Sequence, residues 1–370
     1  MTSLSTITTH AEKERARSFN MFLWSRKAMK FCGKKYIVTC ITVWHVLLLA
    51  GLFCSNVRRT VKSDKPSTKE DSSTNVFTEE LVRENQSEWK VKQACRKSNL
   101  RILYFVHTAP ENTKKRRWLR KTIGDPKIAS VMNSTMVFFV GQTSQRNEHE
   151  AVSDEAIHEG DVVVLNFTDT YKNLTHKFLL GAKWVYDNCR LDSAVTIVKL
   201  DDDVLVNVFA LLSYLKSGVM ALTGFHCKVL TGAVPYRTRK SKWYVSAKDY
   251  PLKVYPPYCA GAAFIMQPTV LFAIYHAARH VPYLWVDDVY VTGVVGEYAN
   301  VTLVDMSQSI ILGAGRSKPT VKDTTVFVHT GWSTRIRTNM EQMWNRFMQF
   351  NQTVNHNFNR NVAVYYRSVG

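Results

Sequence analysis

The 370-residue sequence lacks the signatures of zinc-binding proteins and of nucleic-acid-binding proteins, two classes that its composition could otherwise suggest. It has no Cys-x-x-Cys pair and no cysteine–histidine spacing of the kind that holds structural zinc. Its formal net charge is +19, yet it has no dense basic stripe and no aromatic motif of the RNA-recognition type. Nearly half of the excess positive charge lies in the first 100 residues, outside the expected globular part. We therefore expect no nucleic-acid partner.

Charged residues are also missing from residues 36–53, an apolar run without Asp, Glu, Lys or Arg. Its length is close to the minimum for a transmembrane helix. Basic residues precede it and no small-residue cleavage site follows, which favours a membrane anchor over a buried helix or a cleaved signal peptide. The positive-inside rule predicts a cytoplasmic tail at 1–35, although several basic residues also follow the span. The sequence thus predicts a single-pass type II membrane protein anchored by residues 36–53.

Glycosylation sequons are absent before the apolar run, and all six follow it. They begin at Asn85, Asn133, Asn166, Asn173, Asn300 and Asn351. This one-sided distribution predicts a lumenal C-terminal part with glycosylation at these positions. Its cysteines form an even set that allows two disulfides in three pairings: Cys95, Cys189, Cys227 and Cys259.

The part after the anchor divides by composition. Residues 54–93 are rich in Ser, Thr and charge and have no sustained periodicity, so we expect a flexible lumenal stem. Residues 94–370 are the predicted lumenal globular domain. A tail, anchor, stem and head are typical of enzymes tethered inside a secretory organelle, and also of type II receptors and lectins.

Apolar stretches in the head predict four strands, at 100–107, 136–140, 161–165 and 194–200. Helical spacing of apolar residues over 174–186 predicts a helix between the last two. Strands alternating with helices indicate an α/β fold with a mostly parallel sheet covered on both faces. In such sheets ligands bind at the carboxyl ends of the strands.

Asp201, Asp202 and Asp203 directly follow the fourth predicted strand. Consecutive carboxylates repel one another, but they suit Mg²⁺ or Mn²⁺, which prefer oxygen ligands and often carry a diphosphate. A solvated acidic turn is the alternative.

A basic segment at 114–122 follows the first predicted strand and spaces Arg116 and Arg120 onto one helical face. Guanidinium groups pair well with phosphate oxygens, whereas a plain surface charge run is the alternative. The basic segment and the acidic triplet together suit a nucleotide diphosphate bridged by a metal ion.

A second carboxylate pair, Asp287 and Asp288, lies among apolar residues. Such surroundings disfavour the charged form, raise the pKa and make a better base. The alternative is that Asp287 caps a helix. Gly261 lies among small residues and permits close approach of a ligand or of backbone.

The order of these motifs resembles the β-1,3-glycosyltransferase family, which includes β-1,3-galactosyltransferases and β-1,3-N-acetylglucosaminyltransferases, with Fringe as a more distant relative. Six blocks match in order, from about Cys95 to beyond residue 300. They comprise Arg-x-x-x-Arg-x-Thr at 116–122, Phe-x-x-Gly at 138–141, the Asn-Leu-Thr block at 166–177, Lys-x-Asp-Asp-Asp at 199–207, Lys-Trp-Tyr with Tyr-Pro-x-Tyr-Cys-x-Gly at 242–261, and Asp-Val-Tyr at 287–290. Ile123, Asn166 and Asp287 depart from the family's Trp, Asp and Glu, which makes the donor sugar unsafe to assign from subfamily habits.

The resemblance implies a GT-A-type nucleotide-sugar transferase fold and an inverting transfer from a UDP-sugar to a hydroxyl of a glycan or glycolipid acceptor. The linkage would be β-1,3, with galactose favoured and N-acetylglucosamine next. A catalytically inactive lumenal homologue, acting as a chaperone or glycan-binding partner, is the alternative. The implied location is the Golgi membrane, and the oligomeric state stays open.

The resemblance also implies roles for individual residues. Asp201 and Asp203 would hold Mn²⁺ (or Mg²⁺), with His329 as a candidate third ligand, and Asp288 would be the general base. The residues expected to bind the nucleotide-sugar are Arg116, Arg120, Thr122, Lys199 and Asp202. Those expected to bind substrate are Trp243, Tyr244, Gly261 and Asp287, although packing in the core is the alternative for the two aromatic residues.

Overall fold

The computed structural model describes residues 86–218, 224–313, 321–331 and 334–350. All described residues belong to one compact unit. The predicted tail and anchor, most of the predicted stem, and the sequons at Asn85 and Asn351 lie outside the described residues. No helix in the described ranges is both long enough and apolar enough to cross a membrane.

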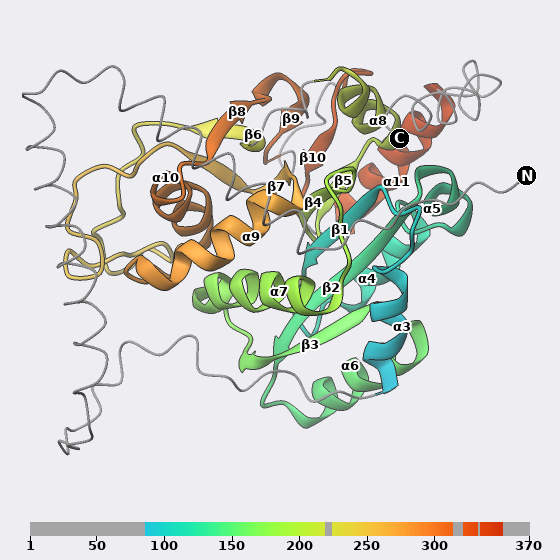
Figure 1. Cartoon of the computed structure of the whole chain (residues 1–370), viewed down its shortest axis with the longest axis horizontal. Coiled ribbons are helices and arrows are strands. Elements are labelled where there is room, and N and C mark those ends of the chain that lie inside the picture. The colour runs from blue at the N-terminus through green and yellow to red at the C-terminus, as the bar shows by residue number, and fades with distance from the viewer. Residues whose placement is uncertain (1–85, 219–223, 314–320, 332–333, 351–370) are drawn as a thin grey trace, which may run out of the picture. The chain divides into compact units, whose positions relative to one another are not determined.

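A mixed, mostly parallel sheet of seven strands forms the centre, in the order β3-β2-β1-β4-β7-β6-β8 (Figure 1). Its strands are β1 (Ile102–His107), β2 (Ser134–Gln142), β3 (Val162–Thr168), β4 (Thr196–Asp201), β6 (Gly224–Leu230), β7 (Tyr258–Met266) and β8 (Thr302–Asp305). The first four strands are parallel, β7 is antiparallel to β4 and β6, and β8 is parallel to β6. The predicted α/β architecture and the four predicted strands are confirmed.

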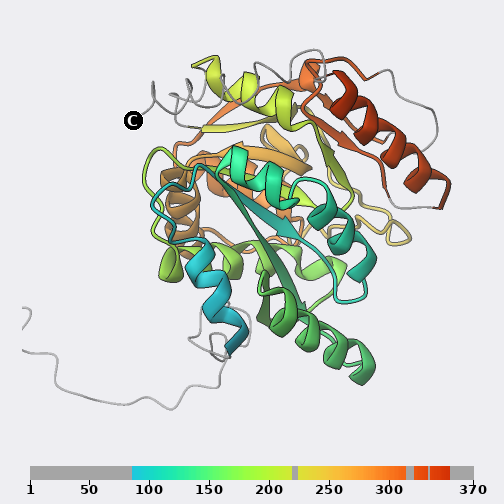
Figure 2. The same ribbon diagram turned by 90° about the vertical axis from the view of Figure 1, so that its right-hand side faces the viewer.

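Alternate residues of β1 enter two separate cores, because side chains of a strand point to opposite faces. Leu103 and Phe105 pack with α3, α7, α9 and η4, whereas Tyr104 and Val106 pack with α4, α5, α6, α8 and α11 (Figures 1 and 2). The α-helices are α3 (Gln86–Ala94), α4 (Thr113–Lys121), α5 (Pro126–Met132), α6 (Arg146–Glu159), α7 (Leu174–Asn188), α8 (Val208–Lys216), α9 (Pro268–Ala277), α10 (Val295–Tyr298) and α11 (Thr334–Phe350). The short 3-10 turns are η1 (Tyr171–Asn173), η3 (Ala278–His280) and η5 (Ser307–Ser309), and η4 (Val289–Val294) is a π-helix.

Helix α3 occupies the end of the range predicted as flexible stem. Its Val91 is fully buried in the core on the α7 side of the sheet, and Cys95 just beyond it bonds to Cys189. The globular domain therefore begins before the predicted boundary at residue 94, because this helix buries an apolar side chain that a stem would expose.

A small second sheet lies beside the end of β4. It consists of β5 (Val204–Val206), β10 (Phe327–His329) and β9 (Ile310–Ile311). β10 runs antiparallel to β5 and parallel to β9. Because β5 follows the acidic triplet directly, this pairing brings a late part of the chain next to it.

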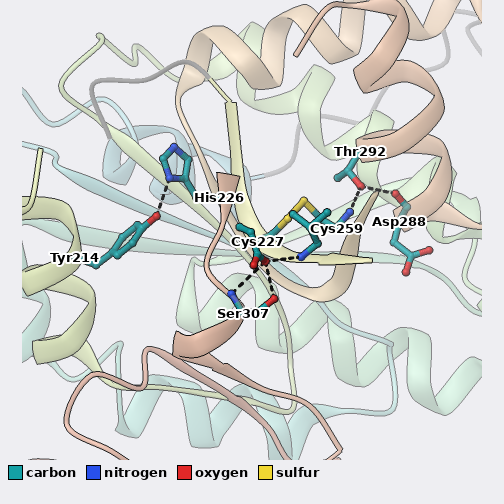
Figure 3. Close-up of a disulfide and its surroundings, with 9 residues drawn as sticks. Tyr214, His226, Cys227, Cys259, Asp288, Thr292 and Ser307 are labelled. Atoms are coloured by element: carbon teal, nitrogen blue, oxygen red, sulfur yellow. Dashed lines mark hydrogen bonds between the residues drawn. A yellow bond between two sulfur atoms is a disulfide. The ribbon is translucent and has the colours of Figure 1, made fainter. Parts of the chain in front are cut away.

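Two disulfides select one of the three pairings that the sequence allowed. Cys95 is bonded to Cys189, and Cys227 is bonded to Cys259. The second disulfide joins neighbouring strands β6 and β7 at the site described next (Figure 3).

The four described sequons lie at the surface. Asn166 and Asn300 are exposed, and Asn133 and Asn173 are partly exposed. Glycosylation at these asparagines stays a prediction.

Candidate active site

The three consecutive carboxylates after β4 enter three different environments. Asp202 is buried and accepts hydrogen bonds from the Thr108 hydroxyl at 2.6 Å, the Asn112 amide at 2.8 Å and the Lys115 ammonium at 2.8 Å. These bonds tie the end of β4 to the segment that joins β1 to α4. We therefore revise the expected role of Asp202 in nucleotide binding, because its oxygens are already engaged inside the protein.

Asp203 lies beside His329, the expected third metal ligand. β10 pairs His329 with Val204, which places the imidazole Nε2 3.3 Å from the Asp203 Oδ1. The hydrogen bond to Asp203 raises the pKa of His329. Burial alone would raise the pKa of Asp203, but the contacts with His329 and Lys115 outweigh it and lower that pKa. Strand pairing thus joins two residues that are far apart in the sequence.

Asp201 is the remaining expected ligand, and its carboxylate faces Lys199 of the same strand. The Lys199 Nζ donates to the Asp201 Oδ1 at 2.6 Å, and the Asp201 side chain is 40% exposed. Although one edge of the side chain is exposed, loss of water around the rest of the carboxyl, opposed by the charge of Lys199 and reinforced by that of Asp203, raises the pKa of Asp201 to about 6.

The described residues include no group of three carboxylate, imidazole or thiol side chains gathered closely enough to hold a metal ion. Two of the three expected ligands, Asp203 and His329, are nevertheless in contact, and Asp201 lies on the same turn with an open edge. Carboxylate and imidazole donors suit Mn²⁺. The donor chemistry therefore fits a divalent cation, with Asp203 and His329 as its best-placed ligands.

The second carboxylate pair opens the helical segment that continues as η4 and α10. The Asp288 Oδ1 accepts the backbone N–H of Val289 at 2.8 Å, so Asp288 makes the helix-end bond that the sequence suggested for Asp287. The Thr292 hydroxyl donates to the Asp288 carbonyl oxygen at 2.6 Å and accepts the Cys259 N–H at 2.9 Å (Figure 3). Asp288 is therefore held against β7 beside the disulfide, on a π-helical turn of the kind often found at functional sites.

Gly261 of β7 lies directly against this acid. A Cβ atom at position 261 would lie 3.0 Å from the Asp288 Cβ and 3.3 Å from its Oδ2. The Gly261 carbonyl oxygen also accepts the Lys199 Nζ at 2.5 Å. The close approach expected at Gly261 is thus made by the side chain of Asp288.

The electrostatics of the acid pair suit proton transfer. Burial, reinforced by the charge of Asp287 and opposed by the Val289 N–H and the charge of Lys199, raises the pKa of Asp288 to about 7. The pKa of Asp287 is also raised, chiefly by burial. A carboxylate whose conjugate acid has a pKa near 7 is a stronger base than an ordinary aspartate.

Arg116, Arg120 and Thr122 find partners within the protein. Arg116 is fully buried and bonds Glu155 through two nitrogens, at 2.9 and 2.7 Å. Arg120 bonds Glu155 at 2.7 Å and Asp161 at 2.8 and 2.7 Å, and the Thr122 hydroxyl is buried and donates to carbonyl oxygens of α4. The expected direct contact with phosphate is corrected here, because carboxylates from α6 and its end, which the local sequence does not show, already pair with both guanidinium groups.

Sequence reasoning assigned no role to two lysines near the triplet. Lys115 contacts both Asp202 and Asp203. Lys177 is buried, pairs with Asp169 at 2.8 Å and donates to the Thr108 carbonyl oxygen at 2.5 Å. Lys115 belongs to the basic segment and Lys177 to the matched block at 166–177. Only their place in these motifs, and no chemical pattern, could have identified them from the sequence.

A group of aromatic side chains, three of them exposed and one partly buried, borders the acid pair. We call it the aromatic ledge, and it consists of Tyr171, Tyr236, Trp243 and Trp285. The Trp243 indole donates to the Tyr171 hydroxyl at 2.8 Å, and ring centroids are 5.4 Å apart for Tyr236 and Trp243 and 6.3 Å apart for Tyr171 and Trp285. Trp243 is 42% exposed and accessible to substrate, whereas Tyr244 is half-buried.

Comparison with known proteins connects this geometry to a family. A family model described as Galactosyltransferase matches residues 114–307. The chain is 29% identical over 212 residues to human beta-1,3-galactosyltransferase 5, covering 57% of this chain and 67% of the relative. It is 34% identical over 222 residues to the lactosylceramide 1,3-N-acetyl-beta-D-glucosaminyltransferase of Xenopus tropicalis, covering 56% and 58%. It is 32% identical over 200 residues to UDP-GalNAc:beta-1,3-N-acetylgalactosaminyltransferase 1 of Mus spicilegus, covering 53% and 60%.

Proposed function

The chain belongs to the galactosyltransferase family of glycosyltransferase enzymes, and we propose that it transfers a sugar from a UDP-sugar to an acceptor hydroxyl with inversion, forming a β-1,3 linkage. Asp288 is the proposed general base. The observation that carries this proposal is the carboxyl of Asp288, with a pKa raised to about 7 and a position fixed against Gly261. A base with this pKa is half ionised near neutral pH.

The proposed reaction is one displacement. The acceptor hydroxyl passes its proton to the Asp288 carboxylate while its oxygen bonds to C1 of the donor sugar. The bond between C1 and the UDP oxygen breaks, and its electron pair leaves with the β-phosphate. Attack from the face opposite UDP inverts the configuration at C1, as in the single displacement of inverting glycosidases.

Mn²⁺ (or Mg²⁺) is the proposed cofactor, with Asp203 and His329 as ligands and Asp201 as the third. Such a cation, when bound, neutralises negative charge that develops on the leaving diphosphate. Lys115, 3.6 Å from Asp203, adds a second positive charge on the same side. Arg116 acts indirectly, because its Nη1 donates to the Thr108 hydroxyl at 3.3 Å and that hydroxyl bonds Asp202.

Galactose is the favoured donor sugar and N-acetylglucosamine the next, since both occur in the names of the matched relatives. The acceptor class is a glycan or a glycolipid, and one matched relative is named for lactosylceramide. The proposed location is the Golgi membrane, with residues 36–53 as a type II anchor, 54–85 as stem and the catalytic domain in the lumen.

The test is transfer by the full-length chain in neutral detergent, with Mn²⁺, single UDP-sugars and a panel of neutral and acidic glycan acceptors. Product with a new β-1,3 linkage from UDP-galactose or UDP-N-acetylglucosamine is the expected result. If no UDP-sugar is transferred or hydrolysed, and calorimetry finds no Mn²⁺-dependent UDP binding, the alternative of an inactive chaperone or glycan-binding homologue replaces the proposal.

A further inference from the structure

The segment between β6 and β7, residues 231–257, is strongly basic. It contains six Lys or Arg residues and one Asp. The Arg237 guanidinium is used within the segment, where it donates to the carbonyl oxygens of Val245, Tyr250 and Leu252. The other five are exposed and have no carboxylate partner in the described part of the chain: Arg239, Lys240, Lys242, Lys248 and Lys253. Stability of the fold therefore does not explain their charge.

This segment, which we call the basic lip, borders the proposed active site. In Figure 1 it is the yellow and gold trace that lies on the opposite side of the molecule from α4, α5 and α6. Its middle reaches the site through the hydrogen bond from Trp243 to Tyr171. Its end packs on η4, where a Cβ at Gly293 would lie 3.1 Å from the Tyr258 Cβ and 3.2 Å from Pro256. The basic lip thus lies at the edge of the proposed active site.

Two lysines place their ammonium groups over the aromatic ledge. The Lys242 Nζ is 4.4 Å from the Trp243 ring centroid and 5.4 Å from that of Tyr171, and the Lys172 Nζ is 5.6 Å from that of Trp285. Exposed aromatic faces can stack on the apolar C–H face of a sugar ring. A neutral sugar could only accept ordinary hydrogen bonds from the neighbouring cations, whereas a carboxylate or sulfate on the sugar would gain the stronger contacts of an ionised acceptor.

The charge changes sign between the basic lip and the reaction centre. Asp287 and Asp288 lie at the centre and repel an anion, while Lys172 and Lys242 at the ledge attract one. A field of this shape orients a charged ligand and favours its association. An anionic substituent would therefore be accepted on a sugar that lies on the ledge, away from the hydroxyl that reacts.

We propose that the acceptor is an anionic saccharide, whose carboxylate or sulfate group binds the basic lip while one of its sugar rings lies on the aromatic ledge. This proposal rests on the proposed function, since it names the acceptor class of the same site. The cations involved are Lys242, which lies over Trp243, Arg239 and Lys240 shortly before it in the exposed segment, and Lys172, which lies over Trp285.

The test compares one N-acetyllactosamine tetrasaccharide with its 6-O-sulfated form, with binding to the full-length chain measured by calorimetry in the presence of UDP and Mn²⁺. We expect the sulfated form to bind about 10-fold more tightly at low salt, and this advantage to shrink at 0.5 M salt, where exposed charges are screened. The triple variant R239Q/K240Q/K242Q should lose the advantage and still bind the neutral form. Trp243→Ala should weaken both.

The matched control is R117Q/K121Q/K127Q, which also removes one Arg and two Lys from exposed positions, but on α4 and α5. It should keep the preference for the sulfated form. Equal affinity for the two tetrasaccharides, or equal effects of the two triple variants, would overturn the proposal. Binding to vesicles of phosphatidylcholine with phosphatidylglycerol, without preference among the tetrasaccharides, would assign the basic lip to a membrane surface instead. Intact Mn²⁺-dependent UDP binding in these samples separates failure of this inference from failure of the proposed function.

Discussion

Gly261 and Asp288 are in direct contact across the space between β7 and the helical segment that carries the acid pair. A side chain as small as a methyl group at position 261 would lie 3.0 Å from the Asp288 Cβ. The same glycine accepts the Lys199 ammonium on its carbonyl oxygen at 2.5 Å, and Lys199 also bonds Asp201. One residue without a side chain therefore contacts the proposed base directly and, through Lys199, is linked to the acidic triplet.

Gly261→Ala should displace Asp288 and lower kcat. The contact distance is shorter than nearly all natural Cβ contacts, so either the acid or β7 must move by a few tenths of an ångström. A small displacement of a catalytic group can cost about 100-fold in rate. Gly296→Ala is the control, because a Cβ there meets its nearest atoms at an ordinary 3.6 Å. Steady-state kinetics showing equal activity for both variants would contradict this account of Gly261.

Asp288→Asn should abolish transfer, with a loss of about 1,000-fold in kcat, because the amide cannot accept the proton. In the wild-type enzyme kcat/KM should rise with pH up to about 7 and level off above it, since only the ionised carboxyl acts as a base. The pH profile should be measured with saturating Mn²⁺. UDP binding with Mn²⁺ should be nearly unchanged in Asp288→Asn, and an equal loss of both would argue against a base role.

Asp288→Asn should also change how the stability of the protein depends on pH. Because burial raises the pKa of Asp288 in the folded state, ionisation costs stability as pH rises from about 4 to about 7. Asp288→Asn removes that cost, so its Tm should exceed that of the wild type at pH 8 and match it at pH 3. Asp154→Asn, at an exposed position on α6, should leave both the activity and this pH dependence unchanged.

His329→Gln should raise the Mn²⁺ concentration needed for half-maximal activity by about 10-fold or more, because loss of a metal ligand or its support weakens binding to that degree. The KM for acceptor should change little, since the imidazole contacts Asp203 rather than the aromatic ledge. Titration of Mn²⁺ into the protein with UDP present, followed by calorimetry, measures the effect directly. His149→Gln on the exposed surface of α6 is the control, and an identical Mn²⁺ dependence for both variants would exclude His329 as a ligand.

Arg116→Gln should destabilise the fold by about 1–3 kcal/mol, because it removes a buried donor from Glu155 and from two backbone carbonyl oxygens, while Arg120 still pairs with Glu155. Chemical denaturation should detect the loss. Arg146→Gln breaks an exposed pair with Glu150 on the same α6 and should cost at most about 1 kcal/mol. If the Arg116→Gln protein is stable and only its KM for the UDP-sugar is raised, the original prediction that Arg116 contacts phosphate directly would be correct.

Local patterns were sufficient for much of the architecture. The apolar stretches that become β1 to β4 are continuous because parallel strands in a covered sheet are buried on both faces. The helical spacing of apolar residues predicted α7, because this helix buries one apolar face. The placement of the acidic triplet after β4 and of the acid pair among apolar residues also came from such patterns, since each depends on residues close in sequence.

The roles within the triplet did not follow from the sequence. Three identical side chains in a row have the same local chemistry, and only partners from distant segments distinguish them. Asp202 faces the β1–α4 segment, Asp203 faces His329 of β10, and Asp201 keeps an open edge beside Lys199.

The roles of Arg116 and Arg120 also did not follow from the sequence. The basic run at 114–122 has the composition of a phosphate-binding surface, and its pairing partners lie on or just after α6. A charge on a helix can meet a ligand, solvent or another side chain, and the choice depends on what the tertiary fold brings within a few ångströms.

The sequence by itself determined the class of this protein, an α/β head of a glycosyltransferase family, and singled out the two acidic segments to which we assign its chemistry. These properties follow from the periodicity of apolar residues and from short motifs, each of which involves residues close in sequence. Only the tertiary structure decided which disulfides form, that Gly261 contacts Asp288, and that Lys242 of the basic lip lies over Tyr171. Those relationships join residues from different strands and helices, and their energies depend on distances that only packing of the whole domain sets.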